Sequence, residues 1–245
     1  MNKEIIKNKV QQLVNHYNAG NYKLVINESN LLLQQIPNNI FLYNLMGSSF
    51  QRLGDQETAK KIFPNILHID KKNIHAMNNL GNTHKILNEF SLAEKYYTQI
   101  LEINPNFTSA LVNYGSLNYK LNKFDKATAL FEKALKIEGD DSLIHYNMGL
   151  NYQSLGYLDK ARFHFNELLR IDPKSTLADR LISRITNYNI NDDHLKKMSE
   201  KLNSQDLTEN SKIDLYFSLS KAFEDCGNFE KSYSHLELGN KLKNK

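Results

Sequence analysis

The feature that most constrains this chain is an internal repeat with a period of 34 residues. Glycine, alanine and an aromatic residue each recur at that spacing. The residues are Gly47, Gly81, Gly115 and Gly149; Ala59, Ala93, Ala127 and Ala161; and Phe63, Tyr97, Phe131 and Phe165. A further position holds Gly20, Gly54, Asn88, Asn122 and Gly156. Self-similarity at this period predicts a stack of equivalent units, because a unit of this size cannot bury its apolar face alone.

Each unit is expected to be a pair of antiparallel helices. The glycine at the eighth position and the alanine at the twentieth are small, as expected where two helices cross and a side chain would hold their backbones apart. The Gly or Asn at the fifteenth position suits the left-handed conformation that ends one helix and allows the next to begin. Pro37, Pro105 and Pro173 mark the ends of three units.

This pattern resembles the tetratricopeptide repeat (TPR) family, whose signature is an aromatic-x-x-L-G-x-x-aromatic run, then A-x-x-x-F and a closing proline. The segments "YNLMGSSF" and "HYNMGLNY" match its first helix. The resemblance implies an all-α fold, a right-handed α-solenoid of stacked antiparallel helix pairs (a TPR superhelix). We predict five TPR units within residues 1–175, at about 6–39, 40–73, 74–107, 108–141 and 142–175.

The pattern departs from the family in the first two units. Leu13, Val25 and Ser29 replace the glycine, the alanine and the aromatic residue of the first unit, as expected of a terminal unit with fewer neighbours. Pro64 lies inside the second helix of the second unit, where it is expected to cause a kink.

After Pro173 the register weakens. Residues 176–212 are predicted to form a divergent helix pair, with Asp192 as the cap of its second helix. Residues 213–245 are predicted to form a TPR-like terminal helix pair, with Gly227 at its turn, Ser232 at the small position and Leu236 in place of the aromatic residue.

Three asparagines occupy the sixth position of consecutive units, Asn79, Asn113 and Asn147. In TPR proteins the first helix lines a concave groove. Asparagine at this position resembles the ladder with which the TPR part of O-linked N-acetylglucosamine transferases holds an extended peptide. An amide side chain can pair with both the N–H and the C=O of a peptide backbone. The predicted function is therefore a non-catalytic protein-interaction scaffold that binds an extended peptide or protein segment.

Three rungs making about six hydrogen bonds of roughly 0.5–1.5 kcal/mol each scarcely cover the roughly 4–15 kcal/mol lost on association. Other side chains must therefore contribute to peptide binding. The candidates are Asn44, Asn78, Asn82, Arg52, Lys85, Tyr119 and Tyr146, with Phe41, Ser48, His75, Ser109, Lys120 and Gln153 on the same helical face. The alternative interpretation is that these asparagines are merely solvated in an asparagine-rich chain.

Composition excludes several other classes of function. The net charge of +4 combines 31 basic with 27 acidic residues, which favours neither a nucleic-acid nor a membrane partner. No run of about 18 apolar residues and no signal peptide is present. The lone Cys226 cannot form an internal disulfide, so a cytoplasmic location is expected.

No enzyme motif is found. The chain contains no phosphate-binding glycine loop, no H-E-x-x-H and no C-x-x-C, so we expect no catalytic residue, no metal and no cofactor. However, "LYFSLSKAFEDCGNFEKSYSHLELGNKLK" resembles the last helix pair before the catalytic domain of bacterial TPR-linked sulfotransferases. The alternative function is therefore a substrate-recognition arm of a sulfotransferase or glycosyltransferase, acting with a transferase domain in cis or in trans that this chain lacks.

Overall fold

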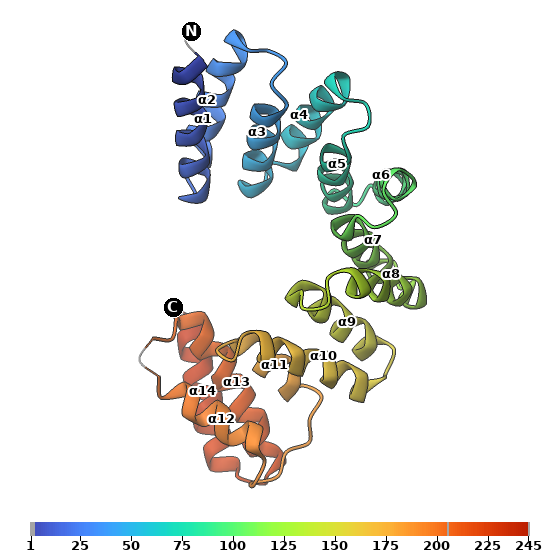
Figure 1. The fold of residues 1–245 in the computed structure, drawn as a ribbon. Coiled ribbons are helices and arrows are strands. Elements are labelled where there is room, and N and C mark those ends of the chain that lie inside the picture. Colours follow the sequence, from blue (N-terminus) through green and yellow to red (C-terminus); the bar gives the residue numbers. More distant parts are fainter. Residues whose placement is uncertain (1–2, 205, 245) are drawn as a thin grey trace. The chain divides into compact units, whose positions relative to one another are not determined.

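The structure is a computed structural model that describes residues 3–204 and 206–244 (Figure 1). Every regular element in these ranges is an α-helix, which confirms the predicted all-α class. The helices are α1 (Lys3–Asn18), α2 (Tyr22–Gln35), α3 (Ile40–Arg52), α4 (Gln56–Ile69), α5 (Ile74–Ile86), α6 (Phe90–Ile103), α7 (Thr108–Lys120), α8 (Phe124–Ile137), α9 (Ser142–Ser154), α10 (Leu158–Ile171), α11 (Thr176–Ser183), α12 (Asp193–Leu202), α13 (Glu209–Asp225) and α14 (Phe229–Lys243).

The chain divides into two compact units. Unit 1 is Met1–Ile137 and holds α1–α8, and unit 2 is Glu138–Lys245 and holds α9–α14. The boundary follows α8, the second helix of the fourth 34-residue repeat.

Unit 1 is a stack of four helix pairs. The second helix of each pair packs on its own first helix and on the first helix of the next pair, so that α2 lies on α3, α4 on α5 and α6 on α7. Consecutive first helices also contact one another, as α1 does α3, α3 does α5 and α5 does α7. In Figure 1, α3, α5 and α7 follow one another along one side of unit 1, and α4, α6 and α8 along the other. We call the first side the first-helix face of unit 1.

The repeated glycine is explained by an aromatic ring. A Cβ atom added to Gly47 would lie 2.6 Å from Cε1 of Phe63, and one added to Gly115 would lie 2.4 Å from Cε1 of Phe131. The ring at the twenty-fourth position thus occupies the space that a side chain at the eighth would need. This differs from the expectation that the two helix backbones meet at the glycine. The four aromatic residues of this series are fully buried.

The predicted left-handed turns are confirmed. Positive φ angles occur at the fifteenth position of every repeat and of the terminal pair, at Gly20, Gly54, Asn88, Asn122, Gly156 and Gly227. Asn88 and Asn122 have φ of 61° and 57°, a conformation that asparagine tolerates better than most residues.

In the first repeat, the large and the small residue of the core occupy opposite positions to those in the later repeats. Leu13 is buried at the position of the glycine, and Ser29 is buried at the position of the aromatic ring. The departure that the sequence associates with a terminal repeat therefore preserves a filled core, which also includes Val25. In the second repeat, α4 continues through Pro64 to Ile69.

Unit 2 departs from the repeat after α10. The expected helices of residues 176–212 are present as α11 and α12, and each packs on α13. Asp192 caps α12 as predicted, because its side chain accepts a hydrogen bond from the backbone N–H of His194 at 2.8 Å. The pair α13–α14 closes unit 2.

A buried polar network holds α11 to α12. The carboxylate of Asp179 accepts hydrogen bonds from Nζ of Lys201 at 2.5 Å and from Nε2 of His194 at 3.1 Å. Nδ1 of His194 also lies 2.6 Å from the hydroxyl of Tyr188, whose pKa is raised by burial. Since every member has a partner, we interpret this network as structural.

Candidate functional site

The predicted asparagine ladder lies on the first-helix face of unit 1 for two of its three members. Asn79 on α5 and Asn113 on α7 are both half-buried. Each is joined to the preceding first helix, because Nδ2 of Asn79 donates to Oδ1 of Asn44 at 2.8 Å and Nδ2 of Asn113 donates to Oδ1 of Asn78 at 3.1 Å. In both bonds, the asparagine at the sixth position of a repeat donates to the asparagine at the fifth position of the preceding repeat. The two bonds are therefore equivalent and lie one period apart.

These amide pairs leave hydrogen-bonding capacity unused. A carboxamide has two N–H donors and an acceptor oxygen, and the inter-repeat bond uses one N–H of each. Within the described residues, neither carboxamide makes a further hydrogen bond, although the backbone oxygen of Asn79 accepts from the side chains of Gln51 and Thr83. The bond also fixes which end of each carboxamide faces the neighbouring helix. The remaining N–H and oxygen are therefore held in a defined orientation.

The third predicted rung, Asn147, belongs to unit 2 and has different surroundings. Its Nδ2 donates to the backbone oxygen of Leu143, one turn earlier in α9, at 2.7 Å. The preceding repeat has Val112 at the fifth position, which offers no amide. The inter-repeat pairing seen at Asn79 and Asn113 therefore does not extend to Asn147.

Two lysines on this face have no anionic partner among the described residues. Nζ of Lys85 on α5 lies 3.4 Å from the hydroxyl of Ser116 on α7, and Nζ of Lys120 donates to Asn88 at 2.8 Å. Neither lysine forms an ion pair within residues 3–204 and 206–244. Burial, together with the nearby charge of Lys120, lowers the pKa of Lys85 to about 8. A negatively charged group beside the ammonium group of Lys85 would therefore be stabilised there.

The other candidates in unit 1 are engaged within the fold. Asn82 accepts a hydrogen bond from the hydroxyl of buried Tyr97 at 2.9 Å. A hydrogen bond with Tyr17 raises the pKa of Arg52, which is otherwise exposed. The ring of Tyr119 is half-buried and lies 5.7 Å from the ring of Phe124. Each of these three side chains therefore contacts a neighbouring side chain of the fold.

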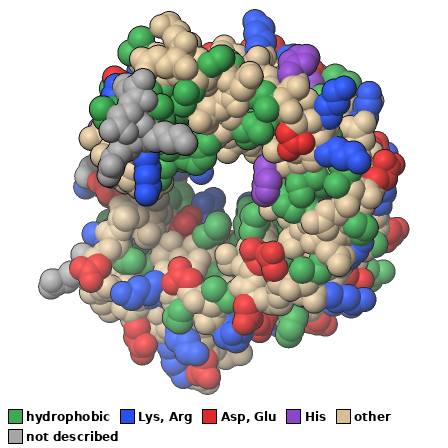
Figure 2. Space-filling model, turned by 45° about the horizontal axis from the view of Figure 1, so that its top comes forward, with side chains coloured by type: hydrophobic (Ala, Val, Ile, Leu, Met, Phe, Trp, Pro, Cys, Tyr) green, Lys and Arg blue, Asp and Glu red, His purple; other side chains and the backbone are tan. Residues whose placement is uncertain are grey.

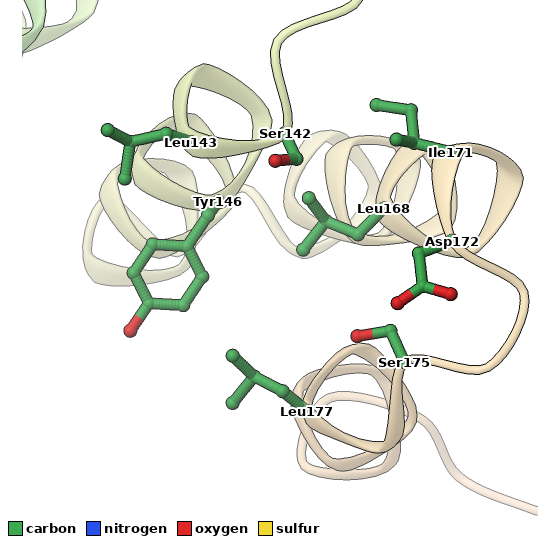
Figure 3. A pocket seen from close by; sticks show the side chains of 8 residues that line it. All are labelled: Ser142, Leu143, Tyr146, Leu168, Ile171, Asp172, Ser175 and Leu177. Carbon is green, nitrogen blue, oxygen red and sulfur yellow. The ribbon is translucent and has the colours of Figure 1, made fainter. Parts of the chain in front are cut away.

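Tyr146, the last candidate, lines a pocket of about 390 Å³ in unit 2. Leu143 and Tyr146 come from α9, Leu168 from α10 and Leu177 from α11, and Figure 3 shows Tyr146 and Leu177 on either side of the opening. Leu143 and Leu177 are 54% and 47% exposed, so their side chains are available to a partner. We call this site the Tyr146 pocket.

One end of the Tyr146 pocket is polar. Asp172 at the end of α10 points towards Ser175, which caps α11 (Figure 3). Oδ1 of Asp172 accepts from the backbone N–H of Lys174 at 3.0 Å. The pocket therefore combines aliphatic walls with one carboxylate.

Sequence reasoning missed most of this pocket and the pairing of the asparagines. Leu143 and Leu177 lie 34 residues apart at the second position, where earlier repeats have the candidates Phe41, His75 and Ser109. Extending that series along the chain would have found both leucines. The amide pairs also carried a signal, since both join asparagines that are 35 residues apart.

The surface chemistry outside these sites is mixed. On the face drawn in Figure 2, acidic and basic side chains alternate, without the basic stripe typical of nucleic-acid binding. None of the described helices is long and apolar enough to cross a bilayer. In the same part of the chain, no three His, Cys, Asp or Glu side chains are grouped as metal ligands would be.

Three consecutive segments, 75–107, 108–141 and 142–175, match the tetratricopeptide repeat family. Residues 75–175 are tetratricopeptide repeats. Asn79, Asn113, Lys85 and the α9 side of the Tyr146 pocket thus all belong to first helices of TPR units. The TPR assignment also accounts for the glycine and aromatic series of the core.

Solved structures, two of them described as TPR proteins, resemble the fold over most of the chain. A thermophilic TPR protein of Thermus thermophilus, TTC0263, has a TM-score of 0.65 at 18% identity, covering 73% of this chain and 97% of that one. A TPR protein from Parabacteroides merdae has a TM-score of 0.66 at 17% identity, covering 96% and 92%. PilF of Pseudomonas aeruginosa has 0.63 at 20% identity, covering 81% and 89%. At these identities the likeness concerns the fold alone. No curated protein matches the chain.

Proposed function

We propose that this chain is a non-catalytic scaffold that binds an extended peptide segment on the first-helix face of unit 1. The observation that carries the proposal is the pair of oriented amides, Asn79 held by Asn44 and Asn113 held by Asn78. TPR proteins in general bind protein partners, and this face presents unused backbone-like hydrogen-bonding groups on consecutive first helices.

The spacing of the two amides suits an extended backbone. Packed helices lie roughly 10 Å apart, which is about the length of three extended residues. Asn79 and Asn113 would thus meet peptide groups about three residues apart, each offering one N–H and one oxygen. In this proposal Asn44 and Asn78 are positioning residues. Asn147 would make an equivalent contact within unit 2 through its carboxamide oxygen.

Lys85 and Lys120 favour an acidic residue in the bound segment. Lys85 is partly desolvated and Lys120 is close enough to lower its pKa, so a carboxylate placed beside them would relieve an unfavourable charge. Hydrogen bonds to charged groups contribute more than neutral ones, roughly 1.5–3 kcal/mol. We therefore propose that the segment carries Asp or Glu near the position that Asn113 holds.

The Tyr146 pocket is proposed to accept an apolar side chain of a partner. Its walls of Leu143, Leu168 and Leu177 suit an aliphatic or aromatic residue, and Asp172 would favour a basic residue beside it. This site lies wholly in unit 2 and is tested separately, by replacing Leu177 with Asp and comparing the set of peptides retained.

The test of the main proposal uses a random library of unstructured peptides selected on the wild-type chain. The double variant Asn79→Ala, Asn113→Ala is expected to bind the selected peptides at least tenfold more weakly, which corresponds to about 1.4 kcal/mol. Peptides rich in Asp and Glu are expected to be enriched. Affinity is measured together with helical content and thermal unfolding.

Two matched controls separate binding from stability. Asn44→Ala with Asn78→Ala breaks the same two inter-repeat bonds but leaves the amides of Asn79 and Asn113, so the loss of affinity should be smaller. Asn65→Ala removes a half-buried asparagine that bonds only within α4, and should change nothing. Equal affinity in the Asn79, Asn113 variant, or an equal loss in the Asn44, Asn78 variant, contradicts the proposal.

The second function, a recognition arm of a sulfotransferase or glycosyltransferase, stays a prediction from the resemblance of residues 215–243. It requires the same peptide-binding face, with the transferase as an additional partner.

A further inference from the structure

The last helix pair leaves an apolar surface uncovered. α13 and α14 border a pocket of about 460 Å³, which includes Phe217 and Glu224 from α13. From α14 it includes Phe229, Tyr233 and Leu236, which are 70%, 68% and 41% exposed. Among the described elements, α14 packs closely on α13 alone. We call this surface the α13–α14 face.

The 34-residue register shows what kind of surface this is. Phe217, Glu224 and Tyr233 stand at the fifth, twelfth and twenty-first positions of the terminal pair. In the second repeat, the residues at these positions bond to the repeat that follows. The contacts are Asn44 with Asn79, Gln51 with Thr83, and Lys60 with Glu89. The α13–α14 face is therefore the continuation of the stacking interface used inside the chain, and it is shaped to receive a helix.

The chain itself carries a helix suited to this face. Phe229, Tyr233 and Leu236 follow the i, i+4, i+7 spacing that places side chains along one stripe of a helix. Glu230 lies in the first turn of α14, next to Lys231, and Lys241 and Lys243 lie in its last turn. A second α14 running antiparallel would therefore bring Glu230 of each helix towards the lysines at the end of the other.

We propose that the α13–α14 face binds a second copy of the chain, with the two α14 helices antiparallel across a two-fold axis. A register that sets Tyr233 opposite Leu236 of the partner copy brings Glu230 within two residues, or about 3 Å along the helix axis, of Lys241. The two-fold axis makes each of these contacts twice, which is the self-complementarity of an isologous dimer. Antiparallel helix dipoles favour the same arrangement.

The experiment measures the mass of the full-length chain by sedimentation over a wide range of concentration. The wild type is expected to pass from monomer to dimer as concentration rises. Tyr233→Glu with Leu236→Glu is expected to remain monomeric with unchanged helical content. Leu24→Glu with Leu31→Glu, which adds the same two negative charges at leucines of α2 that are 41% and 53% exposed, is expected to dimerise like the wild type.

A charge exchange tests the antiparallel register. Glu230→Lys alone and Lys241→Glu alone should each weaken the dimer about fivefold, as expected for two exposed ion pairs. The two changes together should restore it. A wild type that is monomeric throughout, a dimer that persists in the Tyr233, Leu236 variant, or single charge changes that have no effect would each overturn the proposal.

Discussion

The fifth position of the repeat holds Asn44, Asn78, Val112 and Tyr146 in four successive repeats. The contacts made at this position differ with the residue type. Where it is asparagine, it accepts the amide of the next first helix. Val112 cannot accept, and Asn147 bonds to its own helix instead. Tyr146 opens an apolar pocket. The chemistry of the fifth position thus varies from repeat to repeat, whereas the glycine, alanine and aromatic series is the same in the second to fifth repeats apart from Tyr97 in place of phenylalanine.

Lys85 yields a prediction at the same scale. Its pKa is lowered from an ordinary value of 10.5 to about 8, chiefly by burial and then by the charge of Lys120. Between these two pH values the unfolded chain binds a proton that the folded chain does not, so the free energy of unfolding rises with pH in that window. Below about pH 8 the folded chain carries a costly charge.

We therefore expect Lys85→Met to raise the free energy of unfolding by about 1–2 kcal/mol near neutral pH, and by less above about pH 10. Urea unfolding of both proteins at the two pH values provides the measurement. Lys72→Met, at an exposed lysine that follows α4, serves as the control and should show no such difference. A destabilised Lys85→Met protein at neutral pH would contradict this account. The same variant should also lose the preference for acidic peptides.

The core positions could be predicted from the sequence because one residue type recurs there at one spacing. The glycine at the eighth position, the aromatic ring at the twenty-fourth and the left-handed turn are each a strict local requirement. The partners of Asn79 and Asn113 could not be predicted so directly, because they depend on how far consecutive first helices shift along one another. The desolvation of Lys85 likewise follows from packing against α7, which no local pattern encodes.

At the scale of the element, the pair α9–α10 differs from the other pairs by a buried histidine pair. His145 and His164 replace residues such as Met77 and Tyr96 at the fourth and twenty-third positions. Their Nδ1 atoms lie 3.0 Å apart, and Nε2 of His145 lies 3.2 Å from the backbone oxygen of Gly139. The carbonyl requires a proton on that Nε2, so in the neutral pair His164 donates to Nδ1 of His145.

This geometry predicts acid sensitivity of the α9–α10 pair. Burial, and then the neighbouring His145, lower the pKa of His164 from 6.5 to about 4. As pH falls from about 6.5 to about 4, the unfolded chain binds a proton at this histidine and the folded chain does not. The free energy of unfolding therefore falls with pH in this range, by up to about 3 kcal/mol. The stabilisation is fully present above pH 6.5.

The double variant His145→Leu, His164→Leu should lose less stability between about pH 7.5 and about pH 5 than the wild type does. Chemical unfolding monitored by circular dichroism at both pH values measures the difference. His235→Gln, at a half-buried histidine of α14, is the matched control and should keep the wild-type dependence. An unchanged pH dependence in the double variant would show that the histidine pair is not responsible.

At the scale of the whole molecule, the sequence register and the packing divide the chain differently. The 34-residue pattern continues without a break through residues 108–141 and 142–175, yet the compact units separate between Ile137 and Glu138. Each unit contains buried apolar clusters of its own. Those around Leu13, Phe63 and Tyr97 lie in unit 1, and the cluster around Met198 lies in unit 2. A repeat pattern records which residues are equivalent, and it does not mark where the compact units divide.

Each compact unit has buried apolar clusters of its own, and the stability of a repeat array is roughly the sum of its units and junctions. We expect urea unfolding of the full chain to show two transitions, and fragments 1–137 and 138–245 to fold on their own. Their circular dichroism spectra should add to that of the intact chain. Fragment 138–245 carries α13 and α14, so it should also keep the self-association proposed for the α13–α14 face, whereas fragment 1–137 should not. A single cooperative transition, together with an unfolded fragment 138–245, would mean that the junction after Ile137 stabilises the chain as strongly as the junctions inside unit 1.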